Sequence, residues 1–347
     1  MRESLRKVRA KAPLRLGLAG GGTDVAPYSD DFGGMVLNAT ISLYAYCTVE
    51  PRNDGQVRLE ALDIDRAFQH AAVPVLPLDH DLALVAQAYN RIVADYCSGQ
   101  PFAVTIRTHA DVPPGSGLGS SSTMVVAVIT ALAEYLRLPL GEYEIAHLAF
   151  VIERQDLGLS GGKQDQYAAT FGGFNLMEFY AGDRVIINPL RLRHWIVSEL
   201  EAGLVLYFSG RSRSSAAIID EQVRNVQTGQ SRSIEAMHRL KEQAQQMKEA
   251  LLLGNFDAFG RVMRAGWSAK RDMAANISTD EIERVLDAAL AAGAHGGKIS
   301  GAGGGGFVMI SVPPEKKPAV VRALEGFSGR IFGCHFTQEG AQAWTVL

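Results

Sequence analysis

The sequence predicts an α+β protein with two domains. It has 347 residues, whereas a single domain usually holds about 100–200 residues. Strand and helix patterns are mixed through the first half, and the second half is rich in helical patterns before it ends in strands. Elements that do not alternate strictly along the chain are typical of α+β folds. We place the division near residue 200, which gives predicted domains of residues 1–200 and 201–347.

Residue patterns predict the elements of the first domain. Apolar residues three and four positions apart indicate a helix over 81–97 and another over 141–157. β-Branched and aromatic residues are concentrated in 36–49, a predicted strand that ends at the turn signal PRNDG. The other predicted strands are 56–62, 102–108, 174–179 and 185–188, and a further helix is predicted to end near Leu136.

The second domain is predicted to begin with a strand over 204–208 and to continue mainly as helices. Apolar side chains form a helical stripe over 234–251. This run is shorter than three heptads, so ordinary core packing is favoured over a coiled coil. Helical patterns continue over 256–273 and 280–292, and a strand follows the glycine-rich residues 301–306.

Composition and charge argue against several classes of protein. The formal net charge is −3 and the basic clusters are not interleaved with aromatic residues, so no nucleic-acid partner is expected. The longest apolar segment, Met124 to Leu136, is too short to span a bilayer, and we expect no membrane partner. Arg15 interrupts the apolar stretch after the basic N-terminus, which argues against a secretory signal. Three widely spaced cysteines without a CxxC pair favour a reducing cytoplasm over a disulfide framework or a zinc site.

The stretch PPGSGLGSSSTMVV, from Pro113 to Val126, carries the clearest functional signal. Glycines at alternate positions let the backbone approach a bound group closely. The helix start that follows offers unpaired N–H groups and a partial positive charge. Together these features indicate an anion site, for which phosphate is the usual ligand. The structural alternative is a glycine turn with a serine N-cap, but one cap requires fewer serines and glycines than are present.

Neither of the two common phosphate motifs fits the chain. A Walker A loop requires Ser or Thr after its lysine, but Gln164 follows Lys163 and Ile299 follows Lys298. The string 301–306 matches the dinucleotide-binding fingerprint, but it precedes a predicted strand rather than a helix. Neither a P-loop nor a Rossmann dinucleotide site is therefore supported.

The serine-rich stretch resembles the second motif of the GHMP kinases, the family of galacto-, homoserine, mevalonate and phosphomevalonate kinases. The segment KAPLRLGLAGGGTD, residues 11–24, resembles the N-terminal motif of the family, and KISGAGGGGFV, residues 298–308, resembles its C-terminal motif. The three occur in the family's order. The resemblance implies an N-terminal nucleotide-loop domain, a C-terminal ferredoxin-like domain, an active site between them, and ATP and Mg²⁺ as cofactors.

Within the family, residues 19–41 and 161–173 resemble the D-glycero-D-manno-heptose 7-phosphate kinases. Galactokinases typically hold an acidic residue and a histidine where this chain has Gly21 and Gly22. The resemblance implies phosphorylation of the anomeric C1 hydroxyl of heptose 7-phosphate to the 1,7-bisphosphate, on the way to nucleotide-activated heptose for surface polysaccharide. A fucokinase-like or other GHMP small-molecule kinase is the first alternative. A non-catalytic sugar or nucleotide sensor is the second, and the oligomeric state, including a homodimer, is left open.

The resemblance also assigns catalytic and nucleotide-binding residues. Asp165 is the candidate catalytic base, and Lys163 and Arg15 are candidate cations at the reacting group. Ser121 and Glu153 are the candidate Mg²⁺ partners. Without the family context, Asp165 would be taken as a helix N-cap and Glu153 as an exposed helix acid. The nucleotide-binding candidates form one continuous segment: Pro114, Gly115, Ser116, Gly117, Leu118, Gly119, Ser120 and Ser121.

The acceptor candidates come from two segments. Gly22, Thr23 and Asp24 follow the first glycines, and a carboxylate can accept hydrogen bonds from two adjacent sugar hydroxyls. The alternative is a turn aspartate with a local backbone bond. Arg211 and Arg213 are candidates for binding the phosphate that the substrate already carries, because arginine binds phosphate with paired donors. A basic surface loop is the alternative for these two residues.

Overall fold

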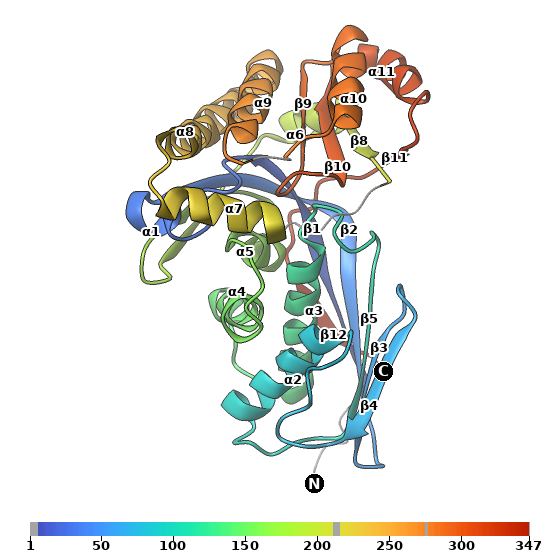
Figure 1. Cartoon of the computed structure of the whole chain (residues 1–347). Helices are drawn as coiled ribbons and strands as arrows, with labels where there is room; N and C mark the ends of the chain where they lie inside the picture. The colour runs from blue at the N-terminus through green and yellow to red at the C-terminus, as the bar shows by residue number, and fades with distance from the viewer. Residues whose placement is uncertain (1–5, 211–215, 275–276, 347) are drawn as a thin grey trace.

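The computed structural model describes residues 6–210, 216–274 and 277–346. The larger of its two sheets runs down the lower part of the molecule, with helices beside it (Figure 1). Its strand order is β12-β1-β2-β5-β3-β4, and β6 pairs with both β2 and β7. The strands are β1 (Val8–Ala19), β2 (Gly34–Pro51), β3 (Gln56–Ala61), β4 (Arg66–Ala71), β5 (Val104–Ala110), β6 (Phe174–Phe179), β7 (Val185–Pro189) and β12 (Gln342–Thr345). β2 is long enough to pair with β6 through its first half and with β5 through its second half.

The smaller sheet is formed by the second half of the chain. It has the order β11-β8-β10-β9, and every neighbouring pair is antiparallel. Its strands are β8 (Leu204–Phe208), β9 (Gly296–Ile299), β10 (Phe307–Ser311) and β11 (Arg330–Phe332). The helices of this half of the chain are α7 (Ala216–Gln227), α8 (Ser231–Leu253), α9 (Phe256–Arg271), α10 (Asp280–Ala291) and α11 (Lys317–Leu324), and a short helix η2 (Pro314–Lys316) precedes the last of them.

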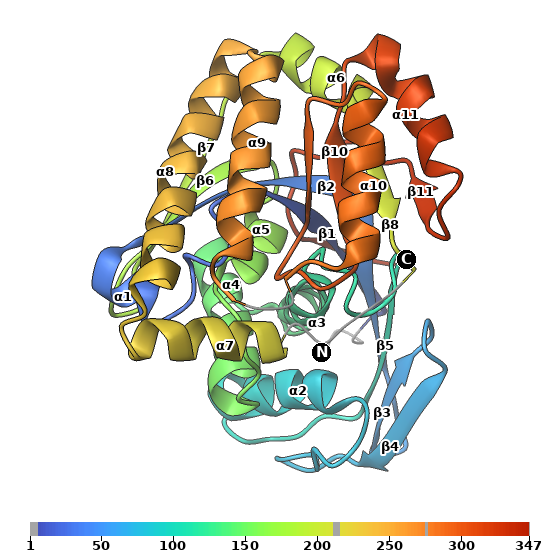
Figure 2. The same cartoon turned by 45° about the horizontal axis from the view of Figure 1, so that its top comes forward.

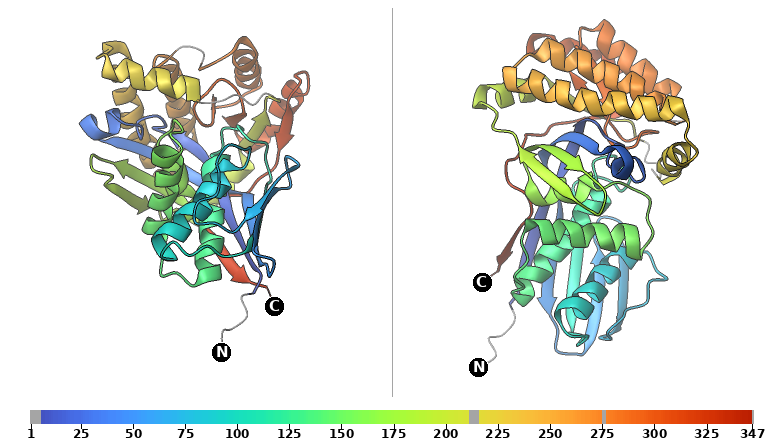
Figure 3. Two further views of the ribbon diagram at one scale, coloured as in Figure 1. Left: turned by 60° about the horizontal axis from the view of Figure 1, so that its bottom comes forward. Right: turned by 90° about the vertical axis from the view of Figure 1, so that its left-hand side faces the viewer.

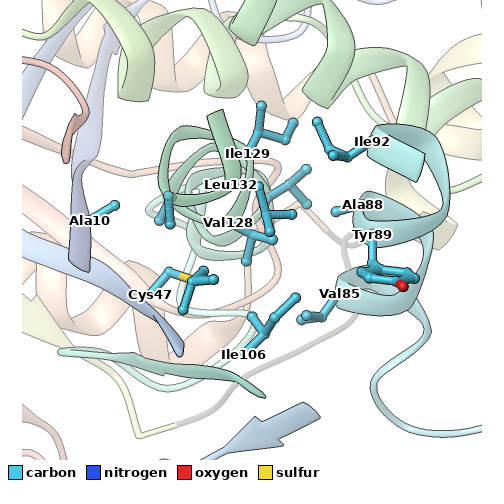
Figure 4. Close-up of a cluster of buried hydrophobic side chains, with 14 of the residues drawn as sticks. Ala10, Cys47, Val85, Ala88, Tyr89, Ile92, Ile106, Val128, Ile129 and Leu132 are labelled. Carbon is cyan, nitrogen blue, oxygen red and sulfur yellow. The ribbon is translucent and has the colours of Figure 1, made fainter. Parts of the chain in front are cut away.

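Helix α3 (Ser120–Leu136) is the centre of the first core, because its apolar residues occur all round the helix and nearly all are buried. It packs on β1 and β2 and against α2 (Ala83–Tyr96). Figure 4 shows Val128, Ile129 and Leu132 of α3 between Ile92 of α2 and the strand residue Ile106. The remaining helices of this half are α1 (Tyr28–Phe32), α4 (Glu142–Phe150), α5 (Gln164–Phe171) and α6 (His194–Ala202).

A second core lies between the two sheets. Leu14, Leu16 and Leu18 of β1 are fully buried against a cluster that includes Met247 of α8 and Phe307 of β10. Figure 3 shows the long helices α8 and α9 over the larger sheet, and Figure 2 shows them beside the smaller one. Because β1 is covered on both faces, every residue of its C-terminal half is buried, including Arg15. This packing brings the glycine-rich end of β1 close to the chain segment between β9 and β10.

Most of the predicted elements are present, with bounds a few residues away from the predicted ones. The predicted helix 141–157 is α4 followed by a π-helical segment, η1 (Val151–Asp156). The elements that were not predicted are β4, α6, α7, β9, η2, α11, β11 and β12. The smaller sheet begins with β8, close to the predicted division, whereas β12 returns to the larger sheet and pairs with β1. In the described ranges no helix is long and apolar enough to cross a bilayer.

Candidate active site

A cavity of about 450 Å³ lies where three glycine-rich segments meet. Its walls include the turn after β1, the loop before α3 and the glycines between β9 and β10. The N-terminus of α5 and the helices α7 and α9 also line it, and α7 lies between α8 and α5 in the view of Figure 1. The three sequence motifs are thus brought together around one cavity.

The loop before α3 has the backbone geometry of an anion site. Gly115, Gly117 and Gly119 all have positive φ, at 72°, 83° and 76°, which favours glycine. Gly119 is the N-cap of α3, and no side chain accepts a hydrogen bond from the first turn. The serine-cap alternative is therefore not what the structure shows, and the first-turn N–H groups are left for another acceptor.

The residues of this loop divide into two groups. Pro114, Gly115, Gly117, Gly119, Ser120 and Ser121 line the cavity, whereas Ser116 and Leu118 are fully buried and do not. Ser116 instead accepts a backbone hydrogen bond from Phe307 at 3.0 Å. A Cβ at Gly117 would lie 2.5 Å from the carbonyl oxygen of Ser300, so only glycine permits this close contact with the third glycine segment.

Arg15 and Asp165 form an ion pair beside the loop. The Arg15 Nε and Nη2 atoms each lie 2.7 Å from Asp165 Oδ1. Arg15 Nη1 donates to the carbonyl oxygen of Gly117 at 2.7 Å, which ties the pair to the loop. Asp165 also lies close to Gly119, where a Cβ would be 3.1 Å from its Cγ atom. The structure thus brings together two of the three predicted catalytic residues and aims them at the N-terminus of α3.

Asp24 lies on the same cavity and is almost fully buried. It accepts hydrogen bonds from the Gly22 and Gln164 backbone N–H groups at 3.1 and 3.0 Å, and from Gln164 Nε2 at 3.1 Å. Burial raises the pKa of this carboxyl above its usual value, the negative charge of Asp165 raises it further, and the backbone donors act against the rise. A Cβ at Gly162 would lie 1.9 Å from Asp24 Oδ2, so the close approach requires glycine there.

Thr23 is not brought to the cavity with Asp24. It is fully buried, and its hydroxyl lies 2.8 Å from the Gly20 carbonyl oxygen and accepts from the Met35 N–H at 3.0 Å. These contacts hold the turn after β1 against β2. Gly22, the third acceptor candidate of this segment, does line the cavity.

The structure brings Ser121 and Glu153, the two candidate Mg²⁺ partners, into contact. Ser121 Oγ donates to Glu153 Oε1 at 3.0 Å, and Gln166 Nε2 donates to Glu153 Oε2 at 2.5 Å. Glu153 is fully buried in the π-helical segment, and π-bulges often occur at functional sites. A hydroxyl and a carboxylate are hard oxygen ligands, and Mg²⁺ usually takes one or two protein oxygens together with water and substrate phosphates. The donor set at this position therefore fits Mg²⁺.

Lys163 does not lie where the sequence analysis expected it. Its Nζ atom pairs with Asp183 Oδ1 at 2.7 Å and lies over the ring of Phe150. It is buried and does not line the cavity, so the structure gives it no contact with Asp165. Arg211 and Arg213 lie outside the described residues.

Several polar residues of the cavity were missed by the sequence analysis. They include Arg154, Gln164, Gln222 and Lys270. Gln222 and Lys270 lie on helices whose patterns indicate only which face is apolar, so no local signal marks them. Burial lowers the pKa of Lys270 to about 8, the positive charge of Arg15 lowers it too, and Asp24 and Asp165 act in the opposite direction.

One end of the cavity is rich in apolar side chains, which were also missed, although Asp63, Asp81 and Thr108 line the cavity as well. It is lined by side chains from β3, α2, α3 and the segment before the phosphate loop: Ala61, Leu82, Val85, Val112 and Met124. An apolar slot next to an anion site is suited to a flat heterocyclic ring attached to a phosphate chain.

Two family models match the chain. The GHMP kinase N-terminal domain matches residues 83–173, and the GHMP kinase C-terminal domain matches residues 247–328. Both matched segments contribute cavity residues, Ser121 and Asp165 in the first and Lys270 and Gly301 in the second.

Whole-chain relatives are also similar. A D-glycero-alpha-D-manno-heptose 7-phosphate kinase of Campylobacter jejuni is 47% identical over 99% of this chain and 100% of that protein. A crystal structure described as a D-glycero-D-manno-heptose 1-phosphate kinase from Bacteroides thetaiotaomicron has a TM-score of 0.83 and 47% identity, covering 98% of this chain and 99% of that one. The L-fucokinase/L-fucose-1-P guanylyltransferase of Bacteroides fragilis is 28% identical, and the alignment covers 91% of this chain and 36% of that protein.

Proposed function

The chain belongs to the GHMP kinase family, and we propose that it transfers the γ-phosphoryl group of ATP to the anomeric C1 hydroxyl of D-glycero-D-manno-heptose 7-phosphate. The full-length relatives at 47% identity support a heptose-phosphate sugar kinase. The product would be the 1,7-bisphosphate, which fits a role in making nucleotide-activated heptose for surface polysaccharide.

The contact between Arg15 and Asp165, beside the loop before α3, is the observation that carries the proposal. A nucleophilic hydroxyl must be close both to a proton acceptor and to the terminal phosphate. Asp165 Oδ2 is the carboxylate oxygen that Arg15 does not bind, and it can accept the proton of the C1 hydroxyl. Arg15 holds the carboxylate in place and adds positive charge where the transferred group passes.

The nucleotide would lie along the cavity from its apolar end to the loop. The purine ring fits among Leu82, Val85 and Met124, and the triphosphate fits against the backbone N–H groups from Gly115 to Ser121. Ser121 and Glu153 would hold Mg²⁺, which neutralises charge on the phosphate oxygens when it is bound. Asp24 would hold sugar hydroxyls on the other side of Asp165.

An acceptor panel tests this proposal. The purified protein is assayed with ATP and Mg²⁺ by coupling ADP release to a detectable reaction, with heptose 7-phosphate, unphosphorylated heptose, L-fucose and D-galactose as acceptors. We expect the highest kcat/KM for heptose 7-phosphate and a ³¹P resonance of a phosphate on C1 of the product. A higher kcat/KM for L-fucose would replace the heptose assignment with the fucokinase-like one.

The same assay separates an enzyme from a sensor. Ser121, Glu153 and Asp165 are all present and in contact with the partners described above, which favours turnover. Binding of ATP without release of ADP on any acceptor would support the non-catalytic alternative instead.

A further inference from the structure

Gln222 presents an unsatisfied polar group to the cavity. It lies on α7, is 2% exposed, and lines the cavity wall. Its Nε2 atom is buried and has no hydrogen-bond partner among the described residues. A buried donor without a partner is unfavourable unless a ligand supplies the acceptor. A residue that served only the packing of α7 would not need an amide in this place.

Lys270 reaches the same part of the cavity from α9. It is 4% exposed, and its Nζ atom donates to the carbonyl oxygen of Gly301. A Cβ built on Gly21 would lie 3.8 Å from this Nζ atom, and a Cβ built on Gly22 would lie 3.5 Å from Gln222 Oε1. The two side chains therefore end near neighbouring residues of the turn after β1.

The glycines of the turn leave this space open. Gly22 has a φ of 106°, and a Cβ there would lie 2.7 Å from Met273 Cε. Any side chain at Gly21 would extend towards Lys270 and Gln164, where its Cβ alone is within 3.8 Å of both. The absence of side chains at these two positions keeps Lys270 and Gln222 accessible from the cavity.

The chemistry around the turn suits sugar hydroxyls. Asp24 can only accept hydrogen bonds when ionised, whereas the Lys270 ammonium and the Gln222 Nε2 group donate them. A hydroxyl both donates and accepts, so it satisfies both kinds of partner. A phosphate ester would be repelled by the carboxylates of Asp24 and Asp165, which are close enough to each other to interact.

We propose that Gln222 and Lys270 bind neighbouring ring hydroxyls of the sugar acceptor, over Gly21 and Gly22 and beside Asp24. The proposal rests on the proposed function, since it assigns acceptor-binding residues to the same cavity. It places recognition of the sugar on α7 and α9, outside the three glycine-rich motifs.

The test uses the full chain and two substitutions that preserve side-chain bulk, Gln222→Leu and Lys270→Met. The matched controls are Gln227→Ala on α7 and Arg261→Met on α9, which change exposed residues. The acceptor is whichever sugar of the panel the wild type turns over fastest, so a wrong heptose assignment changes only the acceptor used. We expect each substitution to raise the acceptor KM about tenfold, the effect of losing one hydrogen bond, with the ATP KM within about twofold of wild type.

A second variant helps to distinguish loss of acceptor binding from misfolding. Gln222→Glu keeps the size of the side chain but replaces the donor with an acceptor, and we expect the same rise in acceptor KM. Thermal unfolding and ATP binding of each variant report whether the fold is intact. Variants that fold and bind ATP but keep the wild-type acceptor KM would overturn the proposal.

Deoxy and unphosphorylated acceptors identify the group that is bound. For one monodeoxy analogue, the difference in KM between wild type and Gln222→Leu should disappear, because the hydroxyl that Gln222 binds is missing. If the difference disappears instead only when the ester phosphate is removed, the pair binds phosphate and the proposal is wrong.

Discussion

The cavity contains charged side chains, each of which would be unfavourable if it were buried alone. Arg15 and Lys270 are both almost fully buried, and they face the carboxylates of Asp24 and Asp165. Buried charges are retained in proteins when they are paired or when they serve a site. The arrangement keeps Arg15 near the point where the proposed phosphoryl transfer would concentrate negative charge, and Lys270 beside the proposed acceptor.

Lys270 should make acceptor binding depend on pH. Burial lowers its pKa from 10.5 to about 8, the positive charge of Arg15 lowers it as well, and Asp24 and Asp165 act against the fall. We predict that the acceptor KM rises as the pH increases through about 8, because the ammonium is then lost. Lys270→Arg retains its charge and should show a much flatter profile. Identical profiles for wild type and variant would contradict this assignment.

The lowered pKa of Lys270 also makes the free energy of unfolding depend on pH. Between pH 8 and 10.5 the unfolded chain keeps a proton on Lys270 that the folded chain has released. Because the unfolded state then binds more protons, this residue makes the free energy of unfolding increase with pH across that window. Lys270→Met should lack this contribution in urea unfolding measured across the window. A variant whose pH dependence matches that of wild type would contradict it.

At the scale of elements, two local departures from regular helices position the proposed metal site. α3 begins directly after Gly119 in the left-handed region, so its first turn carries Ser121 without a side-chain cap. The chain after α4 widens into a π-helical segment, and this directs Glu153 towards Ser121. The sequence analysis paired the two residues by resemblance, but the helical pattern over 141–157 did not indicate the π-helical turn, because periodicity does not distinguish the two helix types.

Glu153→Gln tests this arrangement. The substitution keeps the shape of the side chain and removes its negative charge, so we predict that the Mg²⁺ concentration for half-maximal rate increases by about 10–100-fold. Mg²⁺ titrations of the steady-state rate at fixed ATP measure the effect. Glu142→Gln, at the exposed start of α4, is the control and should leave the titration unchanged. An unaltered titration for Glu153→Gln would remove Glu153 from the metal site.

At the scale of the whole molecule, the site depends on packing between the two sheets. β1 packs against α3, α8 and α9, and its leucines are buried in one cluster with residues of α8, α9 and the smaller sheet. This packing fixes the distance between the first glycine segment and the third. The cavity is therefore a product of the whole fold, although its backbone groups come from short motifs.

The sequence predicted the motifs but not every wall of the cavity. Glycine-rich stretches are visible because glycine is required wherever φ is positive or backbones approach closely. Gln222 and Lys270 could not be identified, because which face of α7 and α9 meets the turn after β1 depends on tertiary packing. Lys163 was expected beside Asp165 because it is close in sequence, but at the start of α5 it points towards Asp183. β12 was missed because strand pairing with β1 is a long-range contact.

Leu16→Ala tests the packing between the sheets. Leu16 is fully buried in the core between the sheets, and removing its side chain should lower the free energy of unfolding by about 2–5 kcal/mol. Leu253→Ala, at a side chain that is 77% exposed, is the matched control and should change it by less than about 0.5 kcal/mol. Urea unfolding followed by circular dichroism measures both. Equal effects of the two substitutions would contradict the role given to this core.

The most direct test of the account is the rate of phosphoryl transfer by Asp165→Asn in a single turnover. The asparagine keeps the shape of the side chain and one oxygen for Arg15 but cannot take the proton of the acceptor hydroxyl. We predict that ATP binding and thermal unfolding stay near wild type while the rate falls by about 10²–10⁴-fold. Asp183 pairs with Lys163 and does not line the cavity, so Asp183→Asn should retain the wild-type rate. A rate near wild type for Asp165→Asn would contradict the proposal that this carboxylate is the catalytic base.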